Sequence, residues 1–144
     1  MARILVVDDD ALCSAMLSED LVRLGHSPLN VGSAQAALRL LVSGEQVDLV
    51  VTDMLMPEMD GVELIQALRQ DHLALPVIAI SSGGIFEAAT ILKVARILGA
   101  DRILRKPVDA VSLGEAISTL LATGRIEDTG DGTAWFAPAA AIES

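Results

Sequence analysis

Four aspartates, a serine and a lysine each follow a short apolar run of the chain: Asp8 to Asp10, Asp53, Ser81 and Lys106. Carboxylates gathered in one cleft repel one another strongly at the effective dielectric constant of about 20 found in proteins, so a cation is expected beside them. Oxygen ligands without His or Cys favour Mg²⁺ or Mn²⁺. A metal, a lysine and a small hydroxyl together suit phosphoryl transfer, in which the group must be positioned and its charge neutralised.

The nucleophile of such a reaction can be one of the aspartates. A carboxylate attacks phosphorus directly and needs no base to remove a proton from it. His26 and His72 fall in predicted loops away from the ends of the apolar runs where these residues stand, which argues against a transition-metal site.

These side chains need a scaffold that brings them together, and the hydrophobic pattern predicts one. Five short apolar, β-branched runs alternate with five segments of helical periodicity, which is typical of a parallel sheet covered on both faces. The predicted strands are Ile4–Val7, Pro28–Val31, Val47–Thr52, Val77–Ile80 and Arg102–Leu104. The predicted helices are Ala11–Leu24, Ser33–Val42, Val62–Gln70, Phe86–Leu98 and Asp109–Ala122. Ligands of such sheets bind at the carboxyl ends of the strands, where the chemical residues lie.

Residues at the expected helix ends support this division. Ser33 and Asp109 stand at N-cap positions, and Gly25 and Gly99 stand where a helix C-terminus favours a residue with positive φ. Asp10 is also readily explained as an N-cap. Cys13, the single cysteine, is expected to be a small core residue without chemistry.

Length and charge limit the classes of function. The 144 residues suit one domain, predicted over 1–123, followed by a flexible acidic and alanine-rich tail over 124–144 that contains Trp135 and Phe136. Ten Lys and Arg against twenty Asp and Glu leave a net charge of −10, which argues against nucleic-acid binding. We expect no membrane span, because no apolar run reaches about 18 residues. The N-terminal apolar run Ile4–Val7 leads directly into three aspartates and leaves no room for a signal peptide, so we expect a cytoplasmic location.

Four motifs in this order are similar to those of a bacterial response-regulator receiver domain of the stand-alone type, over residues 1 to about 123. They are Ile4-Leu-Val-Val-Asp-Asp-Asp10, Asp53-Met-Leu-Met-Pro-Glu-Met-Asp-Gly61, Pro76-Val-Ile-Ala-Ile-Ser81 and Gly99-Ala-Asp-Arg-Ile-Leu-Arg-Lys-Pro107. The resemblance implies an α/β, flavodoxin-like, doubly wound parallel sheet of five strands in the order 2-1-3-4-5, with five helices. It also implies a phosphorylation switch of a two-component system, which assists its own phosphorylation and dephosphorylation but is not an enzyme in the ordinary sense.

The resemblance assigns a role to each site residue. Asp53 would be the phosphoacceptor, and Asp8 and Asp9 would hold Mg²⁺ or Mn²⁺ together with Asp53 and the backbone carbonyl of Leu55.

Further positions around the expected phosphate follow from the same resemblance. Lys106 would pair with the phosphoryl oxygens, Pro107 would be a cis proline that directs Lys106 inward, and Ser81 would bond the new phosphate. Ile103 occupies a position where the family commonly has a switching aromatic, so this chain departs from the usual pattern there.

The expected partners are proteins. A sensor histidine kinase or histidine phosphotransfer protein would supply the phosphoryl group, and a downstream protein would receive the signal. On the predicted helix Phe86–Leu98, Val94 and Ile97 lie opposite the expected core face, and we interpret them as an output surface for a partner or a second copy in a phosphorylation-dependent homodimer.

Two alternatives remain open at this point. A phosphatase of the haloacid dehalogenase type would use Asp8 as nucleophile and Asp10 as acid, although it would need a further acidic pair late in the chain, where Asp109 stands alone. An interaction module that has lost phosphorylation would not need to keep the full set of site residues, which is Asp8, Asp9, Asp53, Ser81 and Lys106.

Overall fold

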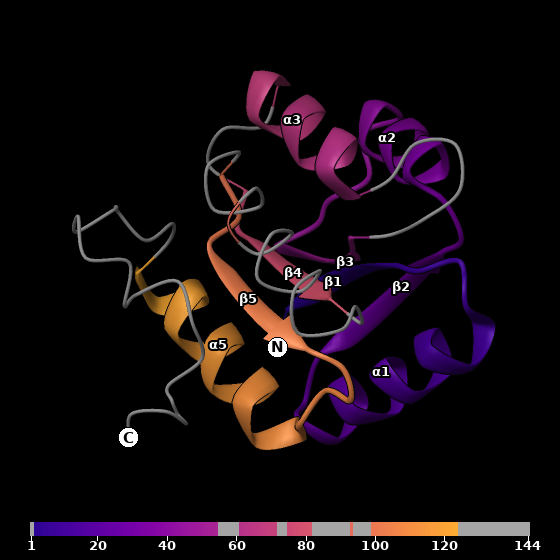
Figure 1. The fold of residues 1–144 in the computed structure, drawn as a ribbon. Coiled ribbons are helices and arrows are strands. Elements are labelled where there is room, and N and C mark those ends of the chain that lie inside the picture. The colour runs from indigo at the N-terminus through magenta and orange to yellow at the C-terminus, as the bar shows by residue number, and fades with distance from the viewer. Residues whose placement is uncertain (1, 55–60, 72–74, 82–92, 94–98, 124–144) are drawn as a thin grey trace.

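The computed structural model describes residues 2–54, 61–71, 75–81, 93 and 99–123, and these form a parallel sheet with helices on both faces (Figure 1). The sheet has five strands in the order β2-β1-β3-β4-β5, which confirms the predicted topology. The strands are β1 (Arg3–Val7), β2 (Ser27–Val31), β3 (Leu49–Asp53), β4 (Val77–Ser81) and β5 (Arg102–Arg105). The described helices are α1 (Ala11–Arg23), α2 (Ala34–Val42), α3 (Gly61–Asp71) and α5 (Ala110–Thr123).

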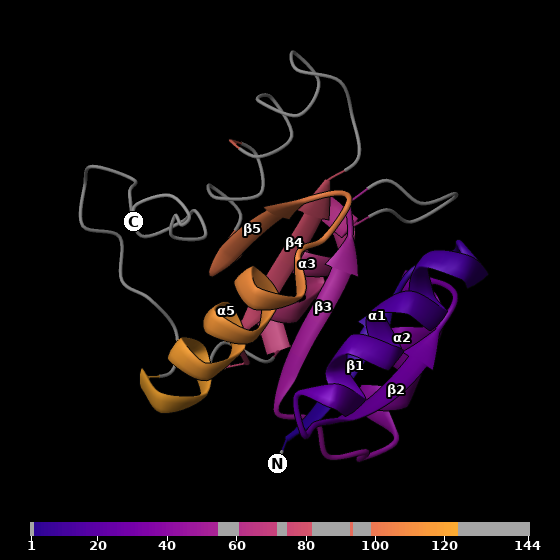
Figure 2. The ribbon, with the colours of Figure 1, turned by 90° about the horizontal axis from the view of Figure 1, so that it is seen from below.

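Two separate hydrophobic cores hold the layers together. Helices α2 and α3 cover one face of the sheet, and α1 and α5 cover the other (Figures 1 and 2). Leu64, Ile65 and Leu68 of α3 are buried in the first core, and Leu21 of α1 and Ile117 of α5 are buried in the second. Every residue of β3 and β4 is buried, as expected for central strands whose two faces both contact helices.

The ends of the helices follow the predicted caps. Ser33 Oγ accepts a hydrogen bond from Ala36 N at 3.1 Å, and Asp109 Oδ2 accepts one from Ser112 N at 3.0 Å. Gly25 and Gly99 have φ angles of +91° and +114°, which a residue without a Cβ adopts most easily.

The predicted element bounds differ from the observed ones by only a few residues, but two differences affect the site. Asp53 and Ser81 are the last residues of β3 and β4 rather than the residues that follow them. Parallel pairing continues through both, since Asp53 pairs with Ile80 and Ser81 pairs with Arg105. The strands therefore hold these two side chains directly.

Other predictions fall outside the described residues. These are most of the predicted helix Phe86–Leu98, the turn after Asp53 and the tail 124–144. The division into a domain over 1–123 and a tail therefore remains a prediction. Among the described helices, none is long and apolar enough to cross a bilayer.

Candidate functional site

The register of the sheet brings the sequence-predicted residues to one edge. Val7 of β1 pairs with Thr52 of β3, so Asp8 and Asp53 follow on neighbouring strands. On the other side of Asp53, the pairing of β4 with β5 places Ser81 beside the strand that leads into Lys106. Side chains from four strands thus converge on this edge.

Three carboxylates meet there. Ligand oxygens of Asp8, Asp9 and Asp53 all lie within 4.8 Å of one another. Asp8 and Asp53 are only 3% and 6% exposed, whereas Asp9 is exposed. Asp8 Oδ1 also accepts a hydrogen bond from Asp10 N at 2.9 Å, which fixes the start of the loop. This all-oxygen donor set, with one ligand open to solvent, fits a hard divalent cation.

Lys106 contributes positive charge to the same cluster. Its Nζ lies 3.5 Å from Asp8 Oδ2 and 3.6 Å from Asp53 Oδ2. Partial burial acts to lower the pKa of Lys106, but the negative charges of Asp53 and Asp8 outweigh it and raise the pKa above its ordinary value. Lys106 is therefore charged at neutral pH, and one lysine facing three carboxylates leaves the cluster with an excess of negative charge.

Ser81 contributes a buried hydroxyl that has no hydrogen-bond partner in the described part of the chain. The residue is 2% exposed, and its Oγ makes no hydrogen bond in the described part of the chain. A buried hydroxyl without a partner costs free energy, so native proteins rarely keep one without a functional reason.

The segment after β5 has the predicted geometry. The peptide bond between Lys106 and Pro107 is cis, as the resemblance implied.

Ile103 of β5 is 3% exposed and packs in the core formed with α2 and α3. Its aliphatic side chain therefore lies inside the protein, at the position where an aromatic was missing from the expected pattern.

Asp10 and Cys13 belong to the start of α1 rather than to the acidic cluster. Asp10 Oδ1 accepts hydrogen bonds from Leu12 N at 3.0 Å and Cys13 N at 3.3 Å. These bonds, led by the one from the Cys13 backbone, lower the pKa of Asp10. The prediction that Cys13 is a core residue was wrong: it is half-buried, because its Sγ donates to Asp10 Oδ2 at 3.4 Å near the surface.

Comparisons with known proteins agree with this geometry. The sequence model of the family described as the response regulator receiver domain matches residues 4–118 of the chain. The chain belongs to this family. The receiver domain is 33% identical over 136 residues to a chemotaxis protein CheY homolog of Campylobacter jejuni, with 92% of this chain and 98% of that protein covered. It is 34% identical over 120 residues to the DNA-binding transcriptional regulator NtrC of Azospirillum brasilense, covering 83% of this chain and 24% of that protein.

Solved structures show the same fold. A response regulator receiver domain protein from Clostridium thermocellum has a TM-score of 0.76 and 29% identity, covering 85% of this chain and 95% of that chain. Because this chain belongs to the receiver-domain family, it is a signalling domain of the two-component type rather than a conventional enzyme.

Three residues singled out from the sequence lie outside the described part of this receiver domain: Leu55, Val94 and Ile97. Their roles as metal ligand and output surface remain predictions.

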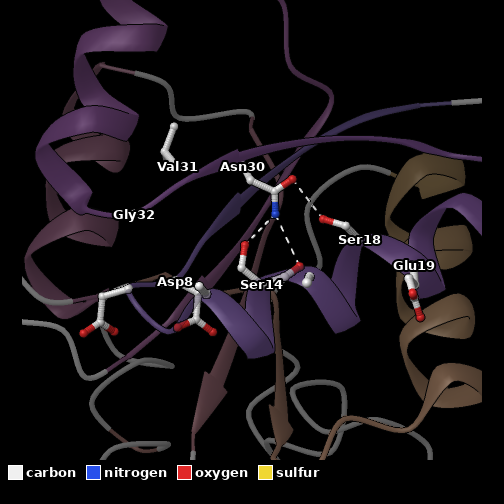
Figure 3. A pocket seen from close by; sticks show the side chains of 10 residues that line it. Asp8, Ser14, Ser18, Glu19, Asn30, Val31 and Gly32 are labelled. Atoms are coloured by element: carbon white, nitrogen blue, oxygen red, sulfur yellow. Dashed lines mark hydrogen bonds between the residues drawn. The ribbon is translucent and has the colours of Figure 1, made fainter.

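Conversely, the sequence analysis missed a polar network between α1 and β2, formed by Ser14, Ser18 and Asn30 (Figure 3). The i, i+4 spacing of the two serines places them on one helix face, but nothing in the sequence indicated that Asn30 would face them.

Proposed function

We propose that this receiver domain accepts a phosphoryl group on Asp53 and signals through protein contacts. The observation that supports this most directly is the meeting of Asp8, Asp9 and Asp53 within 4.8 Å with Lys106 beside Asp53. An Oδ atom of Asp53 would form the new bond to phosphorus while the bond from phosphorus to the donor breaks and its electron pair leaves with the donor. The donor would be a phosphohistidine of a sensor kinase or phosphotransfer protein.

Mg²⁺, or Mn²⁺ in its place, would be held by Asp8, Asp9 and Asp53, with the Leu55 carbonyl as a further ligand. When bound, the metal would neutralise charge on the phosphoryl oxygens. The excess of negative charge in the cluster supports this assignment.

Lys106 and Ser81 would complete the site from the protein side. Lys106, held charged by Asp53 and Asp8, would pair with the phosphoryl oxygens. The buried Ser81 hydroxyl would gain the partner that it lacks in the described structure by donating to the phosphorylated Asp53. That change would link the chemistry at Asp53 to the chain that follows β4.

The two alternative functions find less support. A phosphatase that used Asp8 as nucleophile would need Asp10 as an acid, but Asp10 accepts hydrogen bonds at the start of α1. Asp109, the late acidic candidate, accepts from Ser112 at the start of α5. An interaction module without phosphorylation would not explain why the buried Ser81 hydroxyl lacks a partner or why the three carboxylates lie together.

Labelling with radioactive acetyl phosphate and Mg²⁺, followed by mapping of the labelled residue, tests the proposal. We expect label on Asp53, lost at alkaline pH as for an acyl phosphate, and no label in Asp53→Asn, which keeps the shape but lacks the nucleophile. Label on Asp8 would favour the phosphatase. Absence of label from the folded wild-type chain would favour the module.

A further inference from the structure

A buried arginine with an unused donor lies at the opposite end of the sheet from the acidic cluster. Arg102 is the first residue of β5 and is 9% exposed. Its Nη1 donates to the Asp101 carbonyl at 3.0 Å, but its buried Nε has no hydrogen-bond partner among the residues that the structure describes. A guanidinium carries five N–H donors, and it binds a carboxylate through two parallel hydrogen bonds. The start of β5 therefore offers a cation suited to a carboxylate.

The carboxylate next to Arg102 in the chain is engaged elsewhere. Asp101 Oδ2 accepts hydrogen bonds from Arg69 Nη2 and from Val77 N, both at 2.9 Å. Burial lowers the pKa of Arg102, and the negative charge of Asp101 opposes only part of this effect. The guanidinium nevertheless stays charged, because arginine is not deprotonated in proteins. A carboxylate from another segment would offset the burial of this charge.

Arg102 lies on the face of the sheet that α5 covers. Leu104, two residues further along β5, belongs to the same core as Ile117 of α5, and residues i and i+2 of a strand share a face. Helix α5 runs antiparallel to β5 (Figures 1 and 2). Its 14 residues span about 21 Å, which is longer than the roughly 13 Å of β5, so the helix extends back to the level of Arg102. The chain thus leaves α5 at Thr123 on the side of the molecule where Arg102 lies.

The chain after α5 carries the complementary charge. Gly124 follows the helix directly, at the position where glycine commonly ends a helix and lets the chain reverse. The ten residues 124–133 contain three carboxylates and one cation, which are Glu127, Asp128, Asp131 and Arg125. At about 3.3 Å per residue, the four residues from Thr123 to Glu127 reach up to about 13 Å. Because the segment is tethered, its effective concentration at Arg102 is high, and a single ion pair can hold it.

We propose that Arg102 binds the acidic segment 127–131 of its own chain and holds it beside the start of β5 and the last turn of α5. The tether favours this occupant over an acidic segment of another protein. β5 is the last strand in the order of the sheet, and proteins commonly cover such edge strands with another segment. A protein that binds this side of the molecule would first have to displace the tail. This arrangement is the alternative to the flexible tail expected from the sequence, and it does not depend on the proposed phosphorylation.

Two variants of the full chain with the same loss of charge test the contact. The tail variant carries Glu127→Gln, Asp128→Asn and Asp131→Asn. The control variant carries Glu19→Gln, Glu115→Gln and Glu143→Gln. Each variant loses three carboxylates, but only the tail variant loses those proposed to bind Arg102.

A nitroxide at position 133 measures where the tail lies. Thr133→Cys provides the attachment site, and Cys13→Ser removes the single native thiol while keeping a donor to Asp10. We expect the nitroxide to broaden the NMR amide signals of β5 and of the last turn of α5 more than those of α2, on the other face of the sheet. The broadening should persist in the control variant and be lost in the tail variant. Equal broadening in the two variants, or none in the parent chain, would overturn the proposal.

Urea denaturation tests whether Arg102 is the anchor. Loss of the tail carboxylates leaves the guanidinium buried without its partner. The equilibrium constant for folding of the tail variant should therefore be about tenfold lower than that of the control variant, as for loss of a hydrogen bond to a charged group. In an Arg102→Met background, which lacks the charge but keeps most of the side-chain volume, the tail and control substitutions should have equal effects. A difference of the same size in both backgrounds would show that another group binds the tail.

If Arg102→Met does not fold, the NMR signal of the Arg102 Nε–H group decides instead. This signal should shift in the tail variant and not in the control variant, and an unchanged signal would exclude Arg102 as the anchor.

A mixture of isotope-labelled chains with unlabelled chains that carry the nitroxide distinguishes the chain's own tail from that of a second copy. We expect no broadening in this mixture, and broadening would overturn the intramolecular contact. None of these measurements uses phosphorylation, so their outcome is independent of the labelling test of Asp53.

Discussion

Lys106 Nζ lies 3.6 Å from Asp53 Oδ2, so the residue that follows β5 supplies a positive charge to the carboxylate at the end of β3. Replacing Lys106 with Met removes this charge while keeping most of the side-chain volume. We expect Mg²⁺ to bind several-fold more tightly to Lys106→Met, because a cation no longer competes with the metal for Asp8 and Asp53. Calorimetric titration measures this, with Arg105→Met, an exposed neighbour on β5, as control. Weaker binding of Mg²⁺ to Lys106→Met would show that Lys106 positions the metal ligands.

Asp9 is the exposed member of the acidic cluster, and its removal separates metal binding from stability. In Asp9→Ala we expect Mg²⁺ binding and labelling of Asp53 to be lost. The free energy of unfolding without metal should stay the same or rise, because repulsion among the carboxylates falls. Urea denaturation with and without Mg²⁺ measures both effects, and Glu115→Ala gives the baseline for an exposed carboxylate outside the cluster. A marked loss of stability without metal would mean that the Asp9 carboxylate is structural.

Ser81 should affect the two states of the protein in opposite directions. The Oγ atom is buried without a partner in the described structure, so Ser81→Ala should raise the free energy of unfolding of the unphosphorylated chain by about 1 kcal/mol. The phosphorylated chain should lose the stabilisation that the hydroxyl supplies by bonding the phosphate. Denaturation before and after treatment with acetyl phosphate compares the two. If Ser81→Ala destabilises the unphosphorylated chain by a similar amount, the hydroxyl has a structural partner.

Arg69 joins three segments at the edge of the sheet opposite the acidic cluster. Its Nη2 lies 2.9 Å from Oδ2 of the fully buried Asp101, and its guanidinium also donates to the carbonyls of Leu75 and Gly99. Arg69→Met leaves Asp101 buried without this cation, so we expect a loss of about 3–5 kcal/mol in stability. Arg39→Met, on the exposed side of α2, should change stability little in the same urea titration. An equal and small effect of both substitutions would contradict the importance of the pair.

His26 makes stability depend on pH. Its Nδ1 accepts a hydrogen bond from Ala2 N at 3.2 Å, and burial lowers its pKa below the ordinary value of 6.5. The unfolded chain therefore binds a proton at a higher pH than the folded chain. The contribution of neutral His26 is fully present above pH 6.5 and is lost as the pH falls from there toward the folded pKa.

His26→Gln provides the comparison for this pH effect. Glutamine can still accept from Ala2 N but does not titrate, so its free energy of unfolding should vary less with pH in that window. Parallel pH slopes for the two proteins would show that another group is responsible.

The fold class, the cluster of site residues and the helix caps of this protein could be predicted from its sequence. Apolar runs such as Ile4–Val7 and Val77–Ile80 alternate with amphipathic helices, and this pattern alone predicts a parallel sheet covered on both faces. In such a sheet the carboxyl ends of the strands share an edge, so the cluster of Asp8, Asp53 and Lys106 could also be predicted. Local caps such as Ser33 and Asp109 depend on nearby backbone groups and were likewise predictable.

Tertiary structure decided the contacts between residues that are far apart in the chain. The bonds of Arg69 to Asp101 and Gly99 depend on how α3 lies against the start of β5, and no periodicity encodes that placement. The same is true of the polar network between α1 and β2, because Asn30 meets Ser14 and Ser18 only where β2 lies beside α1. The pairing register also made Asp53 and Ser81 the last residues of their strands. Local patterns report on neighbours within one element, whereas these contacts depend on the packing between elements.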